Sequence, residues 1–131
     1  MQSLSIIIPV YNEEKTLLNV LNKVKELDTI CELEVIIVND GSSDGSKEII
    51  DNNENLYSKA IHLKKNSGKG KAVIEGIKNC NLDYILIQDA DLEYDPSDIK
   101  VFLEENKKFN YDLIMGSRFI SARRSVLHFW H

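Results

Sequence analysis

Continuous apolar runs alternate with amphipathic segments along this chain. The apolar runs predict buried strands, and they cover residues 4–10, 33–38, 60–63, 84–87 and 112–115. Between them, apolar residues recur at the spacing of an α-helix, in segments that begin near residues 12, 46, 72 and 96. Strands that alternate with helices predict an α/β domain with a doubly wound, mostly parallel sheet. In such sheets, ligands bind at the carboxyl ends of the strands.

The residues before two of these helices are typical of helix starts. Asn12 precedes Glu13 and Glu14, which predicts an N-cap followed by an acidic first turn. Asp95 followed by Pro96 predicts the start of the last helix. The helix over 72–80 is expected to pack through its branched apolar side chains, Val73, Ile74 and Ile77.

Length and composition restrict the function classes. The chain has 131 residues, 43% hydrophobic and 28% charged, which is ordinary for one globular domain. Its net charge of −5 argues against broad nucleic-acid binding, which requires a basic surface. Cys31 and Cys80 lie far apart, as expected of buried free thiols in a reducing compartment. No run resembles a signal peptide or is long enough to cross a bilayer, so we expect a cytoplasmic protein.

An acidic segment follows the apolar run at 84–87. Asp89 and Asp91 are two residues apart, so on a strand they share a face, and Glu93 follows at the same interval. Two carboxylates on one face repel each other unless a cation lies between them, and Mg²⁺ or Mn²⁺ would also hold a substrate phosphate. The alternative is an acidic loop that caps the next helix, but Asp95 already supplies that cap. We therefore predict a metal and diphosphate site.

Other strand-end loops offer groups for a nucleoside. Tyr11 provides a ring on which a base can stack, and Glu13 provides an acceptor for ribose hydroxyls or a base N–H. Asp40 can accept an imide or amide N–H of a base. The alternatives are a plain helix start after the first strand and an Asx-type turn after the second, which suits Asp44 better than Asp40.

Two basic features complete this edge of the predicted sheet. The loop at 64–71 combines lysines with glycines ahead of a helix, and it makes Lys69 a candidate nucleotide-binding residue. Its glycine spacing does not match a Walker loop, and a solvated basic loop is the alternative. Arg118 follows the last strand, where it can bind a phosphate bidentately or form a surface ion pair.

The final residues, 123–131, resemble the opening of a helix rather than the end of a fold. Their large apolar side chains predict that further residues cover them in a longer protein, or that they contact a partner or a membrane. Aromatic residues beside Arg123 and Arg124 suit a membrane interface. We favour the interrupted helix, so residues 126–130 are expected to be disordered here or to pack against a neighbouring copy.

The motifs together resemble those of glycosyltransferase family 2, the inverting GT-A-type enzymes that use nucleotide-sugar donors. They occur in family order over nearly the whole chain: Pro9-Val10-Tyr11-Asn12-Glu13, Asn39-Asp40-Gly41-Ser42, Asn66-Ser67-Gly68-Lys69-Gly70, the DXD motif Asp89-Ala90-Asp91, and Gly116-Ser117-Arg118. The segments 91–96 and 127–131 look most like the dolichyl- or polyprenyl-phosphate glycosyltransferase branch.

The resemblance implies a role for each matching residue. Pro9, Tyr11, Glu13 and Asp40 would line the nucleoside pocket, in a GT-A, Rossmann-like fold. Asp89 would lie near ribose and metal, Asp91 would bind a divalent ion, Mg²⁺ or Mn²⁺, and Glu93 would be a further metal ligand; Arg118 would contact a phosphate. Asn39 is a departure, since many members carry an aspartate there. Family members continue beyond this length, so 1–131 would be the donor-binding part and 118–131 the start of the acceptor side.

The expected reaction moves a sugar from a UDP- or GDP-sugar to a polyprenyl or dolichyl phosphate, peripherally at a membrane. No general base stands out beyond the metal-site carboxylates, which fits an acceptor that is already ionised and equally fits a base located in a further, C-terminal part of a longer protein. The alternatives are transfer to a saccharide hydroxyl in cell-envelope polysaccharide synthesis and a non-catalytic nucleotide-binding module. A phosphoacceptor receiver domain would need an acidic pair after the first strand, where Tyr11 and Asn12 stand.

Overall fold

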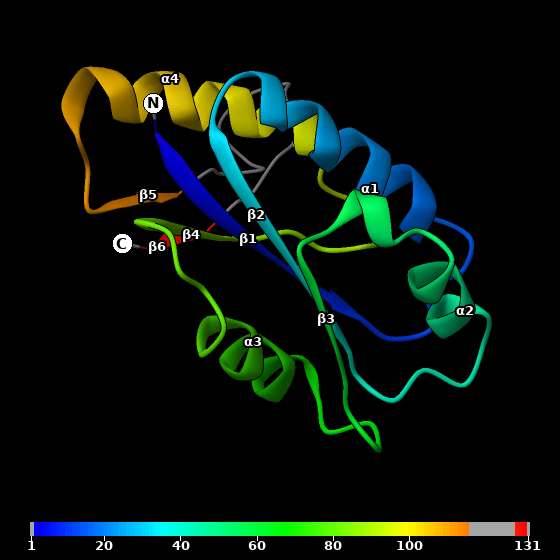
Figure 1. Ribbon diagram of the computed structural model, residues 1–131. Helices are drawn as coiled ribbons and strands as arrows, with labels where there is room; N and C mark the ends of the chain where they lie inside the picture. Colours follow the sequence, from blue (N-terminus) through cyan, green and yellow to red (C-terminus); the bar gives the residue numbers. More distant parts are fainter. Residues whose placement is uncertain (1, 116–127, 131) are drawn as a thin grey trace.

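The computed structural model describes residues 2–115 and 128–130, and within them the strands form one twisted sheet (Figure 1). The strands are β1 (Ser3–Val10), β2 (Glu32–Asn39), β3 (Lys59–His62), β4 (Tyr84–Ile87), β5 (Leu113–Met115) and β6 (His128–Trp130). Their order across the sheet is β3-β2-β1-β4-β6-β5. The pairs β1–β2, β1–β4 and β2–β3 are parallel, whereas β6 is antiparallel to both β4 and β5. This confirms the predicted α/β class and the mostly parallel sheet.

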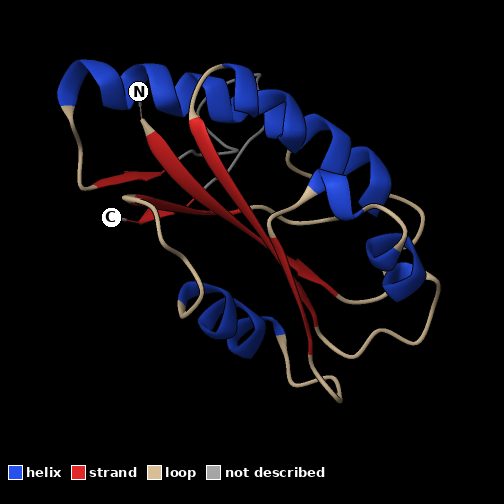
Figure 2. Ribbon diagram, in the orientation of Figure 1, coloured by secondary structure: helices blue, strands red, loops and turns tan. Residues whose placement is uncertain are grey.

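Helices cover both faces of the sheet (Figure 2). The α-helices are α1 (Leu17–Lys25), α2 (Ser46–Asp51), α3 (Lys69–Ile77) and α4 (Ile99–Phe109), and short 3₁₀ turns lie at Glu26–Thr29, Glu54–Leu56 and Pro96–Asp98. In the ribbon, α1 and α4 lie along one face and α3 lies on the other. Asp95 accepts a hydrogen bond from the Ser97 N–H at 3.0 Å, so the predicted cap is confirmed, but it begins a 3₁₀ turn and α4 itself starts at Ile99.

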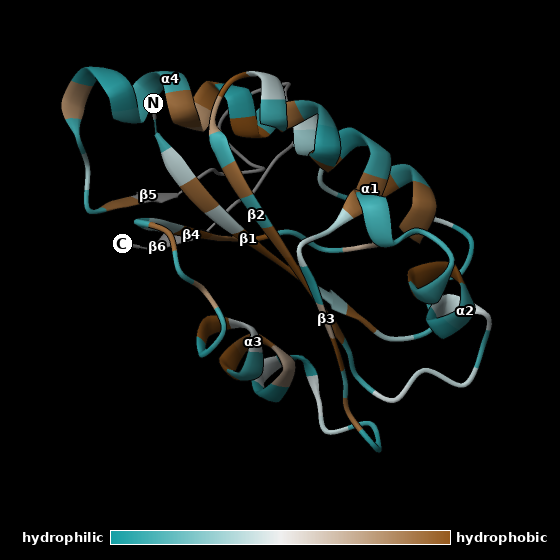
Figure 3. Cartoon of the chain, in the orientation of Figure 1, coloured by the Kyte–Doolittle hydropathy of each residue, from teal (hydrophilic) through white to brown (hydrophobic). Residues whose placement is uncertain are grey.

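The hydrophobic core follows from the alternation of side chains along β1. Ile6 and Ile8 are fully buried in the cluster that includes Leu21 of α1 and Leu103 of α4, while Ile7 packs in a smaller cluster with Ala72 of α3. Successive strand residues point to opposite faces, so a run of isoleucines supplies both layers. Figure 3 shows this as hydrophobic colour concentrated on the central strands.

Helix α3 packs through its small residues, contrary to the predicted face. Ala72 and Gly76 are buried, whereas Ile74 is 54% exposed and Ile77 is 43% exposed. A Cβ on Gly76 would lie 2.5 Å from Cγ2 of Ile7, so the absence of a side chain lets the helix lie close to β1.

The first helix begins later than predicted. Helix α1 starts at Leu17, with Thr16 at its N-cap, and Asn12 has a left-handed backbone with φ of 53°. Asn12 is therefore not the cap, and Glu13 and Glu14 belong to the loop before the helix.

The predicted helix at 123–131 is wrong for His128–Trp130, which form β6. Backbone pairing places Phe129 opposite Leu86 and Ile114, between β4 and β5. This pairing joins segments distant in sequence, so the local pattern could not reveal it. The expected disorder of this segment is wrong for the same three residues, and the rest of the predicted helix lies outside the described residues.

The described part of the chain also bears on the predictions for the cysteines and for membrane spans. Cys31 is buried and Cys80 is partly buried, and both are free thiols. Among the described helices, none has the length and apolar character needed to cross a membrane.

Candidate functional site

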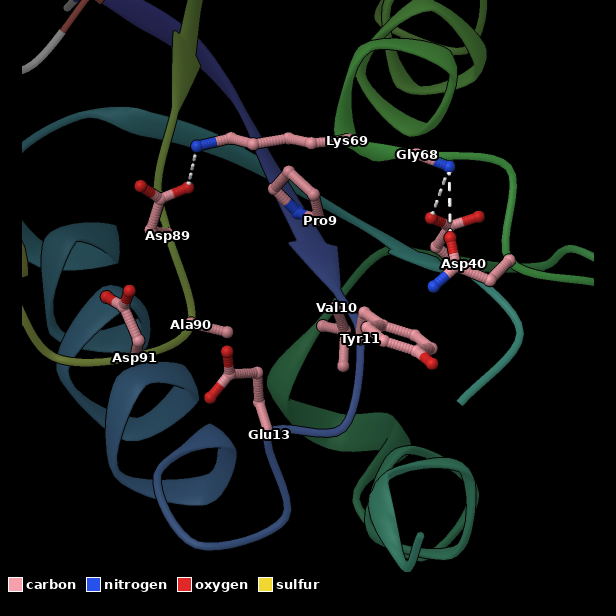
Figure 4. A pocket seen from close by; sticks show the side chains of 11 residues that line it. Pro9, Val10, Tyr11, Glu13, Asp40, Gly68, Lys69, Asp89, Ala90 and Asp91 are labelled. Atoms are coloured by element: carbon pink, nitrogen blue, oxygen red, sulfur yellow. Dashed lines mark hydrogen bonds and ion pairs between the residues drawn. The ribbon is translucent and has the colours of Figure 1, made fainter. Parts of the chain in front are cut away.

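A cavity of about 340 Å³ opens at the carboxyl ends of β1, β2 and β4 (Figure 4). Parallel strands bring the loops that follow them to one edge of the sheet, where ligands of such folds bind. The cavity is lined by Pro9, Val10, Tyr11, Glu13, Asp40, Asn66, Gly68, Lys69, Asp89, Ala90 and Asp91. Every candidate nucleotide-binding residue named from the sequence therefore lies in one place.

The loop after β1 provides the aromatic and acidic groups of the cavity. Tyr11 is 47% exposed, so its ring is accessible to a planar ligand. Burial raises the pKa of the Glu13 carboxyl, the negative charges of Asp91, Asp44 and Asp89 raise it further, and a hydrogen bond from Thr16 opposes the change. This part of the cavity thus concentrates negative charge, which a bound cation would relieve.

Asp40 is buried, with 3% of its surface exposed, rather than lying in an exposed loop as its position suggested. Its Oδ1 accepts the Ser67 N–H at 2.7 Å and its Oδ2 accepts the Gly68 N–H at 2.9 Å. These bonds hold the loop before α3 against the end of β2. The Asx-type turn lies at Asp44, as predicted: its Oδ1 accepts the Ser46 N–H at 2.9 Å.

We expect Asp40→Ala to lower the free energy of unfolding by about 1–3 kcal/mol, because the Ser67 N–H loses its acceptor and the Gly68 N–H keeps only its longer bond, to Asn66 Oδ1 at 3.2 Å. Nucleotide affinity should fall as well, since the loop that carries Lys69 is released. Urea denaturation and calorimetry measure the two effects. Asp28→Ala is the control: Asp28 is exposed, its ion pair with Lys25 is a surface pair, and its loss should change stability by less than about 0.5 kcal/mol. Equal stability losses for both variants would contradict the structural role of Asp40.

Lys69 crosses the cavity to reach Asp89. Its Nζ lies 2.5 Å from Oδ1 of Asp89, and the side chain passes over Pro9 in Figure 4. The Asp89 side chain is 22% exposed and that of Lys69 is 59% exposed. Because the N–H groups of Ser67 and Gly68 bind Asp40, they are not available to bind a phosphate, and Lys69 is the charged group of this segment that lines the cavity.

The acidic loop after β4 is held by residues that the sequence did not single out. The Gln88 side-chain amide donates to the carbonyl oxygens of Asp89 at 3.0 Å and Tyr94 at 2.9 Å. The Thr16 hydroxyl donates to the Ala90 carbonyl at 2.5 Å. Gln88 is fully buried and Leu92 has a left-handed backbone with φ of 64°. These contacts fix the backbone on both sides of Asp91.

The three predicted metal ligands do not converge. Asp91 lines the cavity and accepts the Glu93 N–H on Oδ1 at 3.0 Å, Asp89 is paired with Lys69, and Glu93 is exposed and is not part of the cavity lining. Across residues 2–115 and 128–130, no group of three His, Cys, Asp or Glu side chains is arranged to hold a metal ion. One or two carboxylates still fit Mg²⁺ or Mn²⁺ when substrate phosphates and water complete the coordination. Arg118 lies outside the described residues.

The sheet order and the strand-end cavity define a nucleotide-binding fold of the GT-A type. The chain belongs to glycosyl transferase family 2, whose model matches residues 5–131.

Its curated relatives include polysaccharide synthases from staphylococci. The poly-beta-1,6-N-acetyl-D-glucosamine synthase of Staphylococcus epidermidis is 36% identical over 129 residues, which are 96% of this chain and 31% of that protein. The Staphylococcus aureus synthase of the same name is 32% identical over 133 residues, which are 97% of this chain and 31% of that protein. The chain thus spans about a third of the length of these relatives. They are not polyprenyl-phosphate glycosyltransferases, so they support the family but not the branch that the local motifs suggested.

Solved structures show the same fold. Residues 1–349 of S. aureus TarS in complex with UDP-GlcNAc match with a TM-score of 0.75 and 26% identity, over 95% of this chain and 38% of that one. A mannosyltransferase from Pyrobaculum calidifontis in complex with GDP-Man and Mn²⁺ matches with a TM-score of 0.61 and 25% identity, over 67% of this chain and 27% of that one.

Proposed function

We propose that this chain is the donor-binding part of an inverting glycosyltransferase that transfers a sugar from UDP-N-acetylglucosamine, or a closely related UDP-sugar, to a hydroxyl of a growing saccharide. The observation that carries the proposal is the cavity with an aromatic end at Tyr11 and an acidic end at Asp89 and Asp91, at one edge of the sheet. The donor is suggested by the TarS complex with UDP-GlcNAc, and the saccharide acceptor by the relatives named as N-acetylglucosamine polymer synthases.

Residues at the two ends of the cavity would bind different parts of the nucleotide-sugar donor. Tyr11 would stack on the base and Asp40 would hold the adjoining loop while its remaining lone pairs accept a base N–H. Asp89 would accept ribose hydroxyls, and Lys69 beside it would compensate the charge of the diphosphate. Asp91 would hold a divalent cation, which when bound stabilises the departing diphosphate as a Lewis acid. Arg118 is proposed for the same diphosphate from sequence alone.

The acceptor decides whether a general base is needed. A sugar hydroxyl must lose a proton as it attacks the anomeric carbon, whereas a phosphate is already ionised. Since this chain spans about a third of the curated relatives, the acceptor-binding groups and the base are proposed to lie in the remaining part of a longer protein. A polyprenyl-phosphate acceptor is the second candidate, favoured by the resemblance of the segment 91–96 to that branch.

Ligand-dependent stabilisation tests the donor assignment. With Mn²⁺ present, UDP at a hundred times its dissociation constant should raise the free energy of unfolding by about 2.7 kcal/mol, and GDP should do so less at equal concentration. Preference for GDP would contradict the donor, and a response to neither nucleotide would contradict the function. Incubation of the protein with labelled UDP-N-acetylglucosamine and either N-acetylglucosamine oligomers or polyprenyl phosphate then identifies the acceptor from the product.

A further inference from the structure

The loop after β1 and the loop after β2 are joined by hydrogen bonds that run in both directions. Asn12 is central to them: its Oδ1 accepts the Ser43 N–H at 2.8 Å and the Asp44 N–H at 3.2 Å, and its own N–H donates to the Ser42 hydroxyl at 3.0 Å. A side chain that the sequence assigned to a helix cap thus bonds to residues about thirty positions away.

The two glutamates that follow repeat this arrangement. The Glu13 N–H donates to the Ser46 hydroxyl at 2.9 Å, and Ser46 is fully buried. The Glu14 N–H donates to Asp44 Oδ2 at 3.2 Å, and Glu14 Oε2 in turn accepts the Gly45 N–H at 2.8 Å. Residues 12–14 and 42–46 together are called the loop clamp below.

The backbone of Asn12 shows that the loop clamp fixes a specific conformation. Its φ of 53° lies in the left-handed region, where asparagine is tolerated better than most residues but still costs energy. The reciprocal hydrogen bonds offset that cost. Asn12 lies between Tyr11 and Glu13, the two residues of this loop that line the cavity, so its backbone conformation sets how they lie relative to each other.

We propose that the loop clamp positions Tyr11 and Glu13 for the nucleoside, with Asn12 as the positioning residue. This inference rests on the proposed function, and it assigns a role to Asn12 and to residues 42–46, which do not themselves line the cavity. The acidic loop at the diphosphate end is held by Gln88, which lies outside the loop clamp. Damage to the loop clamp should therefore affect recognition of the nucleoside and leave the contribution of the metal intact.

The variant Asn12→Gly tests the proposal, because glycine accepts the left-handed backbone and removes only the side-chain acceptor. We expect the affinity for UDP, and equally for uridine, to fall about tenfold, because the hydrogen bonds that Asn12 Oδ1 accepts from Ser43 and Asp44 are lost. The ratio of the UDP dissociation constants without and with Mn²⁺ should stay within twofold of its wild-type value. Asn12→Asp keeps an acceptor oxygen and should recover most of the affinity.

Asn110→Gly is the matched control. Asn110 also has a left-handed backbone, with φ of 51°, and its Oδ1 accepts a hydrogen bond from the Tyr84 hydroxyl at 3.0 Å, next to the start of β4 and away from the cavity. The variant Asn110→Gly makes the same chemical change as Asn12→Gly and gives the same gain of backbone freedom in the unfolded chain. It should leave the affinity for UDP within twofold of the wild type.

A measurement without ligand separates the loop clamp from the proposed function. In the free protein, Asn12→Gly should speed amide hydrogen exchange at residues 43–45 and shift the ring resonances of Tyr11. If the wild type bound neither UDP nor GDP, the proposed function would fail, while this measurement would still decide whether the clamp orders Tyr11. Unchanged Tyr11 resonances, or wild-type affinity for UDP in Asn12→Gly, would overturn the inference.

Discussion

Replacing Asp91 with asparagine is expected to remove the Mn²⁺-dependent part of UDP binding and to lower the rate of sugar transfer by about a hundredfold or more. Asp89 and Asp91 both line the cavity. Asp89 forms an ion pair with Lys69, whereas Asp91 does not and is therefore the carboxylate assigned to the cation. Loss of one group that stabilises developing charge at a reacting centre typically costs a factor of about 10²–10³. Asparagine keeps an oxygen that can accept the Glu93 N–H, so the loop should keep its shape.

Calorimetric titration of UDP with and without Mn²⁺ measures the binding effect, and sugar transfer from a labelled donor measures the rate. Glu93→Gln is the informative companion, because Glu93 was implied as a metal ligand by the family resemblance but is exposed and is not part of the cavity lining. The structure predicts a change of less than twofold for Glu93→Gln. If that variant lost Mn²⁺ dependence and Asp91→Asn kept it, the assignment of the two carboxylates would be reversed.

The strands and the edge at which the site lies followed from the sequence because they depend on local patterns. A buried parallel strand is a continuous apolar run, and the runs at 4–10 and 84–87 match β1 and β4 to within a residue. Parallel strands then place the residues after them at one edge, which is why Tyr11, Asp40 and Asp89 line one cavity. Their chemical roles remain predictions.

The residues that hold this cavity in shape could not be found in the same way. Asn12 stands where a helix cap is typical, yet its partners lie in the loop after β2, and no local pattern encodes that contact. Gln88 ends an apolar run and looks like the last residue of a strand, but its amide joins the two sides of the acidic loop. The burial of Asp40 could not be predicted from the sequence either, because it depends on the loop before α3 packing against the end of β2.

The acceptor prediction shows the difference between a local motif and the whole chain. The segment 91–96 alone suggested a polyprenyl-phosphate acceptor, but similarity over 96% of the chain connects it to a synthase of a saccharide polymer. The segment 91–96 begins at the cavity proposed for the donor, so a short motif there says little about an acceptor proposed to bind elsewhere. The acceptor is therefore better judged from a longer protein than from this cavity.

Gly41→Ala is expected to be the most destabilising single change near the site, lowering the free energy of unfolding by about 2–5 kcal/mol. Gly41 has φ of 68°, and a side chain in that region costs about 1–2 kcal/mol. An added Cβ would also lie 2.5 Å from the backbone nitrogen of Asn66 and 2.5 Å from the carbonyl carbon of Lys65. Backbone atoms cannot rotate away as a side chain can, so relief requires moving the whole loop, at a further cost of about 1–3 kcal/mol.

Displacing that loop should also reduce nucleotide binding, because it would separate Ser67 and Gly68 from Asp40 and move Lys69 away from Asp89. Gly70→Ala is the matched control in the same segment: a Cβ added there would meet nothing within 4 Å, and the residue is exposed in the first turn of α3. Alanine favours a helix over glycine, so this variant should be neutral or more stable by up to about 1 kcal/mol. Urea denaturation of both variants measures the difference. Similar stabilities for Gly41→Ala and Gly70→Ala would mean that the loop before α3 is not packed against the end of β2, and the cavity would then lack the wall that carries Lys69.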